Sequence, residues 1–244
     1  MKILLLDLET APSLAYIWRM FKEFIRPSQI VENGYILCYT AKWLNDDKIF
    51  FDSVWNSGEK KMLDSIYKLL DEADAVVHYN GNKFDIPTLN REFIKNKMSP
   101  PSPSKNIDLY NICKRHIALM SYSLDYVCRY FGLGEKKVIH FETWKEIING
   151  NKEEEKVMEE YNKHDVIILE GLYNTLKPWI RVHPNFGLHS ELGLVCPNCG
   201  GNHYHRRGYS FTYAGKYQRF QCQGCGNWFR NKKAEQTNVF VNAN

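Results

Sequence analysis

Residues 2–10 read KILLLDLET, a short apolar run that ends in two acids. A run of this length and composition predicts a buried strand. Asp7 and Glu9 are separated by one residue, so they point to the same side of that strand. Adjacent carboxylates raise each other's pKa unless a cation neutralises them. The pair therefore indicates either a solvated strand end or part of a site for Mg²⁺ or Mn²⁺, which prefer oxygen ligands.

The patterns that follow alternate between strand and helix. The segments rich in β-branched and aromatic residues predict strands, and the segments with apolar residues at helical spacing predict helices. Residues 99–105 contain three prolines and predict a loop. The order predicts an α/β domain with a mixed sheet flanked by helices. The predicted elements are strands at 2–10, 35–43, 48–54 and 75–79, and helices at 58–73, from Asp85 to about 97, and over most of 106–177.

Two further acids lie at the boundaries of predicted elements. Asp85 follows a buried strand and the turn Asn80-Gly81-Asn82, and it opens a helix. A helix cap explains an aspartate there, and a cap residue can also face a metal. Tyr161 and Asp165 are four residues apart on a late helix, so they share one of its faces. A phenol can then lie next to a metal-binding carboxylate.

Taken in order, these motifs resemble a known family. D-x-E-T at 7–10, N-x₃-F-D at 80–85 and Y-x₃-D at 161–165 are similar to the three motifs of the DEDD (DnaQ-like) 3′–5′ exonuclease superfamily, a ribonuclease H-like group that includes polymerase proofreading domains. The tyrosine position resembles the DEDDy subtype. KFDIPTLNREF, NIDLYNICK, SLDYVCRYFGLGEKK and LKPWIRVHPN resemble the YprB-like exonucleases, many of them phage-encoded. The resemblance covers about residues 1–180.

This resemblance implies a ribonuclease H-like fold and a two-metal-ion hydrolysis of phosphodiester bonds. In that scheme Asp7, Glu9 and Asp165 hold the metal on the side of the attacking water. Asp7 bridges to the second metal with the help of Asp85, and Tyr161 orients the water. Thr10 and Asn80 are expected to contact the terminal nucleotide. The implied cofactors are two Mg²⁺ or Mn²⁺ ions.

Four of the seven cysteines form two C-x₂-C pairs near the C-terminus, at Cys196/Cys199 and Cys222/Cys225. Two such pairs predict a structural Zn²⁺ site, because a module of about 35 residues has too little core to fold without metal. A pair of redox dithiols is the alternative. His203 and His205 could compete as ligands, but four thiolates already close a tetrahedral site.

The segment between the cysteine pairs alternates aromatic and basic residues, and it predicts a hairpin with one aromatic and one cationic face. Cations can meet phosphates, and aromatic rings can stack on unpaired bases. The alternative is that the rings form the module's own small core. The segment resembles the zinc ribbons that accompany phage and transposase DNA-binding domains. The expected substrate contacts are Arg206, Arg207, Lys216 and Arg219.

Charge supports the same division of the chain. Residues 1–189 hold 25 basic and 26 acidic side chains, whereas residues 190–244 hold 7 basic and 2 acidic ones, a balance of 7 − 2 = +5. A basic end suggests contact with a polyanion, or else a solubilising tail. The predicted domains are an exonuclease domain at 1–180, a linker at 181–194, a zinc ribbon at 195–231 and a flexible tail at 232–244.

No signal peptide or membrane span is expected, so a cytoplasmic location follows, in a bacterium or a phage-infected cell. The predicted function is 3′–5′ exonuclease action on nucleic acid. DNA is favoured over RNA and single strands over duplexes, and replication or repair proteins are the protein partners considered. Two alternatives remain open: a structure-selective endonuclease on the same fold, and a non-catalytic nucleic-acid-binding protein.

Overall fold

The computed structural model describes residues 1–135, 137–190 and 193–237. The chain forms two compact units, one made of residues 2–173 and one that runs from residue 174 onward and includes Met1. The predicted domain boundaries at 180, 194 and 231 stay a prediction. No helix among the described residues is long and apolar enough to cross a membrane.

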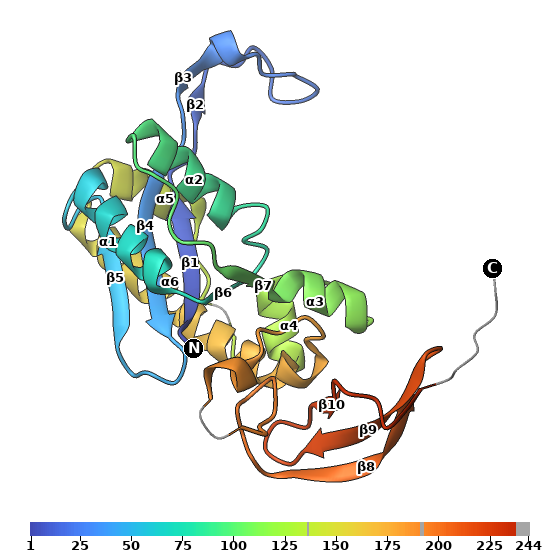
Figure 1. The fold of residues 1–244 in the computed structure, drawn as a ribbon. Coiled ribbons are helices and arrows are strands. Elements are labelled where there is room, and N and C mark those ends of the chain that lie inside the picture. Colours follow the sequence, from blue (N-terminus) through green and yellow to red (C-terminus); the bar gives the residue numbers. More distant parts are fainter. Residues whose placement is uncertain (136, 191–192, 238–244) are drawn as a thin grey trace. The chain divides into compact units, whose positions relative to one another are not determined.

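A five-stranded mixed sheet is the centre of the first unit (Figure 1). Its strand order is β5-β4-β1-β6-β7, and β1 pairs antiparallel with β4 and parallel with β6. This confirms the predicted mixed sheet flanked by helices. The strands of this sheet are β1 (Ile3–Thr10), β4 (Ile36–Trp43), β5 (Ile49–Ser53), β6 (Ala75–His78) and β7 (Lys105–Asp108).

The helices of this unit fall close to the predicted positions. They are α1 (Glu59–Glu72), α2 (Asp85–Lys95), α3 (Leu109–His116), α4 (Leu124–Tyr130), α5 (Phe141–Ile148) and α6 (Lys152–Leu176), which ends just before Pro178. The prediction that residues 106–177 are mostly helical is confirmed, except at its start. The stretch predicted as mostly helical begins inside strand β7, which pairs parallel with β6 through Ile107 and Asp108.

Alternation along β1 decides which side chains reach the core. Leu4, Leu6 and Leu8 are buried together with residues of α1 and α2, and burying each leucine contributes about 2 kcal/mol. The intervening Asp7 and Glu9 must then point to the opposite face of the sheet. On that face a second apolar cluster joins β4 to α5 and α6, and its buried members are Ala11, Leu37, Cys38, Ile147, Met158 and Tyr161.

Between β1 and β4 the chain forms a two-stranded extension that the sequence patterns do not predict. It consists of β2 (Leu14–Ala15), a 3₁₀ helix at Pro27–Gln29 and β3 (Ile30–Glu32), with β2 and β3 paired antiparallel. In Figure 1 it projects from the end of the sheet where β1 ends. We call residues 14–32 the arm.

The second unit is built on strand β9, which pairs antiparallel with β8, β10 and β11. The strands are β8 (Tyr204–Phe211), β9 (Gly215–Cys222), β10 (Trp228–Arg230) and β11 (Gln236–Thr237). Two short 3₁₀ helices precede them, at Lys177–Trp179 and Phe186–His189.

The structure describes part of the segments predicted as a linker and a flexible tail. In the segment expected to be a linker, the Phe186 amide donates a hydrogen bond to the Pro197 carbonyl (2.8 Å), so the segment packs on the first cysteine pair. The segment expected to be a flexible tail contributes β11 to the sheet because Glu235–Thr237 pairs with β9. Residues 191–192 and 238–244 of these segments lie outside the described residues.

Candidate functional site

Three of the four predicted acids converge. One carboxylate oxygen from each of Asp7, Glu9 and Asp165 lies within 4.8 Å of the other two. Oxygens bound at about 2.1 Å to one Mg²⁺ lie up to about 4.2 Å apart, so a cluster of this size fits a single hard divalent ion. Three adjacent carboxylates also repel one another in the absence of a cation. The donor set therefore suits Mg²⁺ or Mn²⁺.

The position of α6 brings Asp165 to β1 across 158 residues of sequence (165 − 7). The Lys42 ammonium on β4 forms an ion pair with Glu170 on α6 (2.5 Å), and both side chains are mostly buried. Glu170 also accepts a hydrogen bond from the Asn45 amide (3.1 Å) at the β4–β5 turn. These interactions fix α6 against the sheet one turn beyond Asp165.

Asn162 is a site residue that the sequence motifs did not identify. Its side chain is fully buried, and its amide donates a 2.6 Å hydrogen bond to the Asp7 carboxylate. Asn162 thereby holds Asp7 in orientation from α6. Its place three residues before Asp165 on a helix was the available signal, since residues at that spacing share a face.

Asp85 lies beside the cluster but is not one of its three members. It is the first residue of α2, it is buried, and its carboxylate accepts a hydrogen bond from the Leu8 amide (3.2 Å), between Asp7 and Glu9 on β1. Burial is the main cause that raises the pKa of Asp85 to about 7. The charge of Asp108 raises this pKa further, while the amides of Asp85 and Leu8 oppose the shift. A nearby cation would favour the ionised form.

The turn before α2 permits this close approach. A side chain at Gly81 would place its Cβ 2.5 Å from the His78 ring and 2.7 Å from the Asp85 carboxylate. The Gly81 amide donates to Nδ1 of the buried His78 (3.1 Å). Burial lowers the pKa of His78, against the opposing charge of Asp108, so the neutral ring acts as the acceptor. The absence of a side chain at Gly81 is thus what lets the histidine and the acid pack against the turn.

Tyr161 lies one turn before Asp165 on α6, and its ring is buried in the apolar cluster with Cys38 and Met158. Burial, together with the charges of Glu9 and Asp7, raises the pKa of the Cys38 thiol well above its usual range. This part of the core therefore adjoins the acids. The assigned role of Tyr161 stays a prediction.

A cavity of about 580 Å³ opens beside the acids, with Asp7 in its wall. Asn80 lines the same cavity, next to aromatic side chains. Its amide donates to Asp108 (2.9 Å), which also caps α3 through the Tyr110 amide. Thr10 lies at a bulge that follows Glu9 on β1, and its expected contact with substrate stays a prediction. The full lining is Asp7, Tyr79, Asn80, Tyr110, Met120, Ser121, Tyr122, Ser123 and Leu124.

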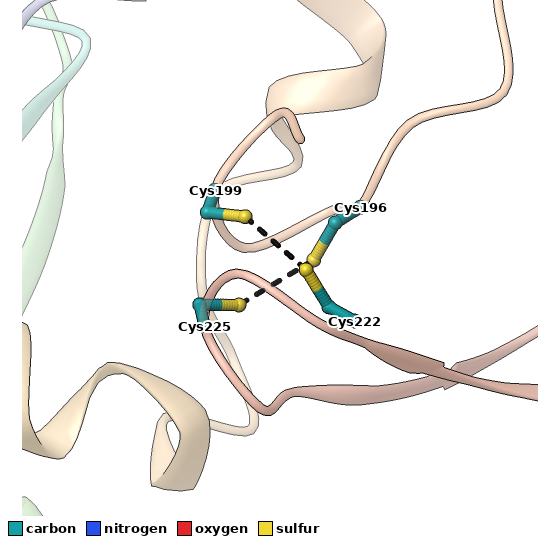
Figure 2. Close-up of side chains that lie close together, drawn as sticks. All are labelled: Cys196, Cys199, Cys222 and Cys225. Carbon is teal, nitrogen blue, oxygen red and sulfur yellow. Dashed lines mark hydrogen bonds between the residues drawn. The ribbon is translucent and has the colours of Figure 1, made fainter. Parts of the chain in front are cut away.

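The four paired cysteines converge in the second unit, as Figure 2 shows. The sulfurs of Cys196 and Cys225 are 3.7 Å apart, and those of Cys199 and Cys222 are 3.6 Å apart. These distances are far longer than a disulfide bond. Four sulfurs at about 2.3 Å from a tetrahedral Zn²⁺ would lie about 3.8 Å apart, so the cluster fits Zn²⁺.

The strands between the two cysteine pairs carry the cations that were predicted to contact nucleic acid, but the prediction of separate aromatic and cationic faces is wrong. Arg219 lies over the Trp228 ring (4.9 Å), and Arg230 lies over the Tyr217 ring (3.7 Å). Lys216 lies over Tyr209. Cations and rings are therefore interleaved, because each ring lies two residues along its strand from the residue that pairs with the cation. A ring cluster formed by Tyr204, Phe220 and Phe229 is the small core that the alternative interpretation expected.

The predicted cations lie on this hairpin and not among the residues of the first unit. Arg206, Arg207 and Arg219 are exposed, and Arg219 also donates to the Arg207 carbonyl (3.0 Å). His164 is adjacent to Asp165 in sequence. Its ring nitrogen Nε2 lies 2.8 Å from the Glu135 carbonyl oxygen, and this contact gives it a structural role.

Comparison with known proteins adds three findings. The family described as the RNase_H superfamily matches residues 35–177, which is more than half of the chain and includes Asp85 and Asp165. No curated protein matches the chain. The family B DNA polymerase from the hyperthermophilic archaeon Pyrobaculum calidifontis is similar in structure, with a TM-score of 0.56 and 19% sequence identity over 72% of this chain and 24% of the polymerase.

The structural match shows the fold alone, and this chain corresponds to only about a quarter of the polymerase. The family match, the five-stranded mixed sheet and the clustered acids agree with one another. The chain belongs to the RNase H superfamily.

Proposed function

We propose that the protein is a metal-dependent 3′–5′ exonuclease that acts on nucleic acid, preferably single-stranded DNA. The observation that carries this proposal is the convergence of Asp7, Glu9 and Asp165 within 4.8 Å, on a fold of the RNase H superfamily. The motifs around these acids and the tyrosine at position 161 resemble those of DEDDy exonucleases, and this resemblance supports exonuclease action.

In this proposal Asp7, Glu9 and Asp165 would hold one divalent ion, and Asp7 with Asp85 would hold a second. Bound ions would supply positive charge at the scissile phosphate and lower the pKa of the attacking water. Asn162 keeps the Asp7 carboxylate in place through its 2.6 Å hydrogen bond. Tyr161, one turn before Asp165, would orient the water by hydrogen bonding, since a phenol is in general a poor acid or base at neutral pH.

The cavity beside Asp7 supports a nucleotide as the ligand. Its volume of about 580 Å³ lies within the usual range for small-ligand sites. Tyr79 and Tyr110 contact each other edge to face in its wall, and such rings can pack against a base. Asn80 supplies a polar group in the same wall. A terminal nucleotide in this cavity would place its phosphate near Asp7.

The cysteine cluster supports a second attachment to the substrate. A Zn²⁺ ion would order residues 195–231, with the exposed arginines available to phosphates. The rings of Trp228 and Tyr217, each already facing an arginine, could stack on unpaired bases. This favours single strands over duplexes.

The test is digestion of a 5′-labelled single strand with Mg²⁺ or Mn²⁺. The wild-type protein should shorten it stepwise from the 3′ end, and single-stranded DNA, duplex DNA and RNA should be compared side by side. Asp7→Ala or Asp165→Ala should lower the rate by at least about a hundredfold. Glu153→Ala, which changes an exposed acid in the first turn of α6, serves as the control. Equal rates for the wild type and both site variants would overturn the proposal.

A further inference from the structure

The arm exposes an unusual amount of apolar surface. Trp18 is 91% exposed, Phe24 is 83% exposed and Phe21 is 80% exposed. Met20 (85%) and Tyr16 (76%) are exposed to a similar extent. Single exposed apolar residues are ordinary on a protein surface, but a group of this size confined to one short segment marks an interaction site. The exposed apolar side chains therefore indicate that the arm binds another molecule.

Hydrogen bonds hold the arm in this form. The Glu23 carboxylate accepts from the amides of Trp18 (2.9 Å) and Arg19 (2.7 Å), and these amides lower the pKa of Glu23. The Gln29 side chain donates to the Tyr16 carbonyl (2.9 Å) and accepts from the Arg26 amide (2.8 Å). The aromatic side chains therefore extend outward from an ordered loop.

Charge on the arm matches a polyanion. Within the arm the basic side chains are Arg19, Lys22 and Arg26, and the acids are Glu23 near its tip and Glu32 at its end. The carboxylate of Glu23 is already engaged by the loop's own amides. Its charge is therefore compensated locally, whereas Arg19 and Lys22 are exposed. A surface of aromatic rings and cations suits unpaired bases and their phosphates.

The root of the arm adjoins the candidate site. The chain leaves the sheet after Glu9 and Thr10, and the arm begins at Leu14. The Ala11 amide donates to the Tyr35 carbonyl (2.8 Å) where the two ends of the extension meet. Figure 1 shows the arm continuing from the end of β1. A nucleic-acid strand bound along the arm would therefore run toward the end of β1 that carries Glu9.

We propose that the arm binds an unpaired nucleic-acid strand, with its aromatic side chains stacked on bases and Arg19 and Lys22 facing phosphates. The inference rests on the proposed function because the bound strand is then the nuclease substrate. It adds a binding surface that none of the DEDD-like motifs contains.

The test uses the full chain and measures the affinity for 5′-fluorescein-labelled oligothymidylate of about 20 nucleotides by fluorescence anisotropy, with Ca²⁺ in place of Mg²⁺ to slow cleavage. Trp18→Ala/Phe21→Ala/Phe24→Ala should raise Kd at least about tenfold, because these rings can no longer stack on bases. Ile94→Ala removes an apolar side chain that is 76% exposed on α2 and should leave Kd unchanged. The triple variant should keep the wild-type Tm, because its side chains are solvent-exposed.

A second variant tests the charges. Arg19→Gln/Lys22→Gln should reduce the slope of log Kd against log salt concentration by about 1.4, because each phosphate that a protein neutralises on a single strand adds about 0.7 to that slope. Unchanged affinity and salt slope in the two arm variants would overturn the proposal. So would a wild-type protein that does not bind the oligonucleotide.

Other occupants of the arm give different results. If the triple variant loses self-association in sedimentation, or loses binding to neutral phosphatidylcholine vesicles, while its oligonucleotide affinity is unchanged, the proposal fails. Hydrolysis of the p-nitrophenyl ester of thymidine 5′-monophosphate by the wild-type protein tests the proposed function separately, because this substrate is too short to lie along the arm. The two proposals can therefore fail independently.

Discussion

The chain assembles its two clusters of candidate ligands in different ways. The carboxylates come from residues 7, 9 and 165 and are held by a five-stranded sheet with an apolar cluster on each face. The cysteines span only residues 196–225, in a unit whose ring cluster is small. The hydrophobic core therefore sets the carboxylate geometry before any ion binds, whereas the cysteine geometry should depend on its ion.

The largest expected effect is on the cysteine cluster. Cys196→Ser/Cys199→Ser should lose zinc and unfold residues 195–231, because a structural Zn²⁺ contributes about 10–16 kcal/mol to folding of a small module. The unit of residues 2–173 should stay folded. Zinc analysis and amide hydrogen exchange would measure both results, with Cys128→Ala, a buried cysteine of the other unit, as the control. If residues 195–231 stay protected from hydrogen exchange in the zinc-free variant, the cysteine geometry does not depend on its ion.

The next effect concerns Asp85 in protein that keeps its zinc but has no added Mg²⁺ or Mn²⁺. The pKa of about 7 in the folded state lies above the unfolded value near 3.9, so the folded protein binds more protons between about pH 4 and pH 7. Asp85 therefore reduces the stability as the pH rises through that window. Asp85→Asn should be more stable than the wild type by a few kcal/mol at pH 8, at about 1.4 kcal/mol per pKa unit, and equal to it near pH 4.

Urea unfolding at several pH values would measure this difference. Added Mg²⁺ should reduce the advantage of Asp85→Asn at pH 8, since a cation near the acid favours its ionised form. The asparagine can still accept from the Leu8 amide, so that hydrogen bond is not the variable. If the free energies of unfolding of the two proteins depend on pH in the same way, ionisation of Asp85 does not destabilise the folded protein.

A smaller effect is expected for the tyrosine. Tyr161→Phe keeps the buried ring and removes only the hydroxyl, so it should lower kcat about tenfold to a hundredfold with KM and Tm little changed. Tyr67→Phe serves as the control, because it removes a hydroxyl that donates a long hydrogen bond (3.4 Å) to the exposed Pro100 carbonyl. If kcat is the same in both variants, Tyr161 belongs to the core and not to the reaction.

The smallest expected effect is on nucleic-acid binding by the exposed arginines of the β8–β9 hairpin. Arg206→Gln/Arg207→Gln should weaken single-strand binding only a few fold and should leave the zinc content unchanged, since exposed cations contribute little individually. Lys232→Gln/Lys233→Gln removes two other cations of the same unit and should have less effect. Fluorescence anisotropy at two salt concentrations would measure the difference. If the two double variants bind the oligonucleotide equally well, then the net charge of the unit, and not the hairpin, attracts the nucleic acid.

The sequence was sufficient where the signal is local. Asp7, Glu9 and Asp165 stand in short motifs, and the structure brings these three together. The cysteine pairs needed only their spacing. The central strands could be predicted because their apolar runs are buried on both faces, as in Leu4, Leu5 and Leu6.

The features that could not be predicted depend on contacts that are distant in sequence. Strand β7 begins with the polar and exposed Lys105 and Asn106, and it forms only because β6 offers a partner edge. The arm has strands of two or three residues, too short to show alternation. Asn162 resembles any polar helix residue until α6 is placed beside β1, where its amide meets Asp7.

The turn at Gly81 has a consequence for the history of the family. A methyl group there would collide with both the His78 ring and the Asp85 carboxylate, so the glycine and the fourth acid should be inherited together. Among diverged relatives, replacement of this glycine should accompany loss of the acid, and it would mark lineages in which the site has been abandoned. A single small residue at a variable position of the 80–85 motif would then record whether the acidic site was still in use.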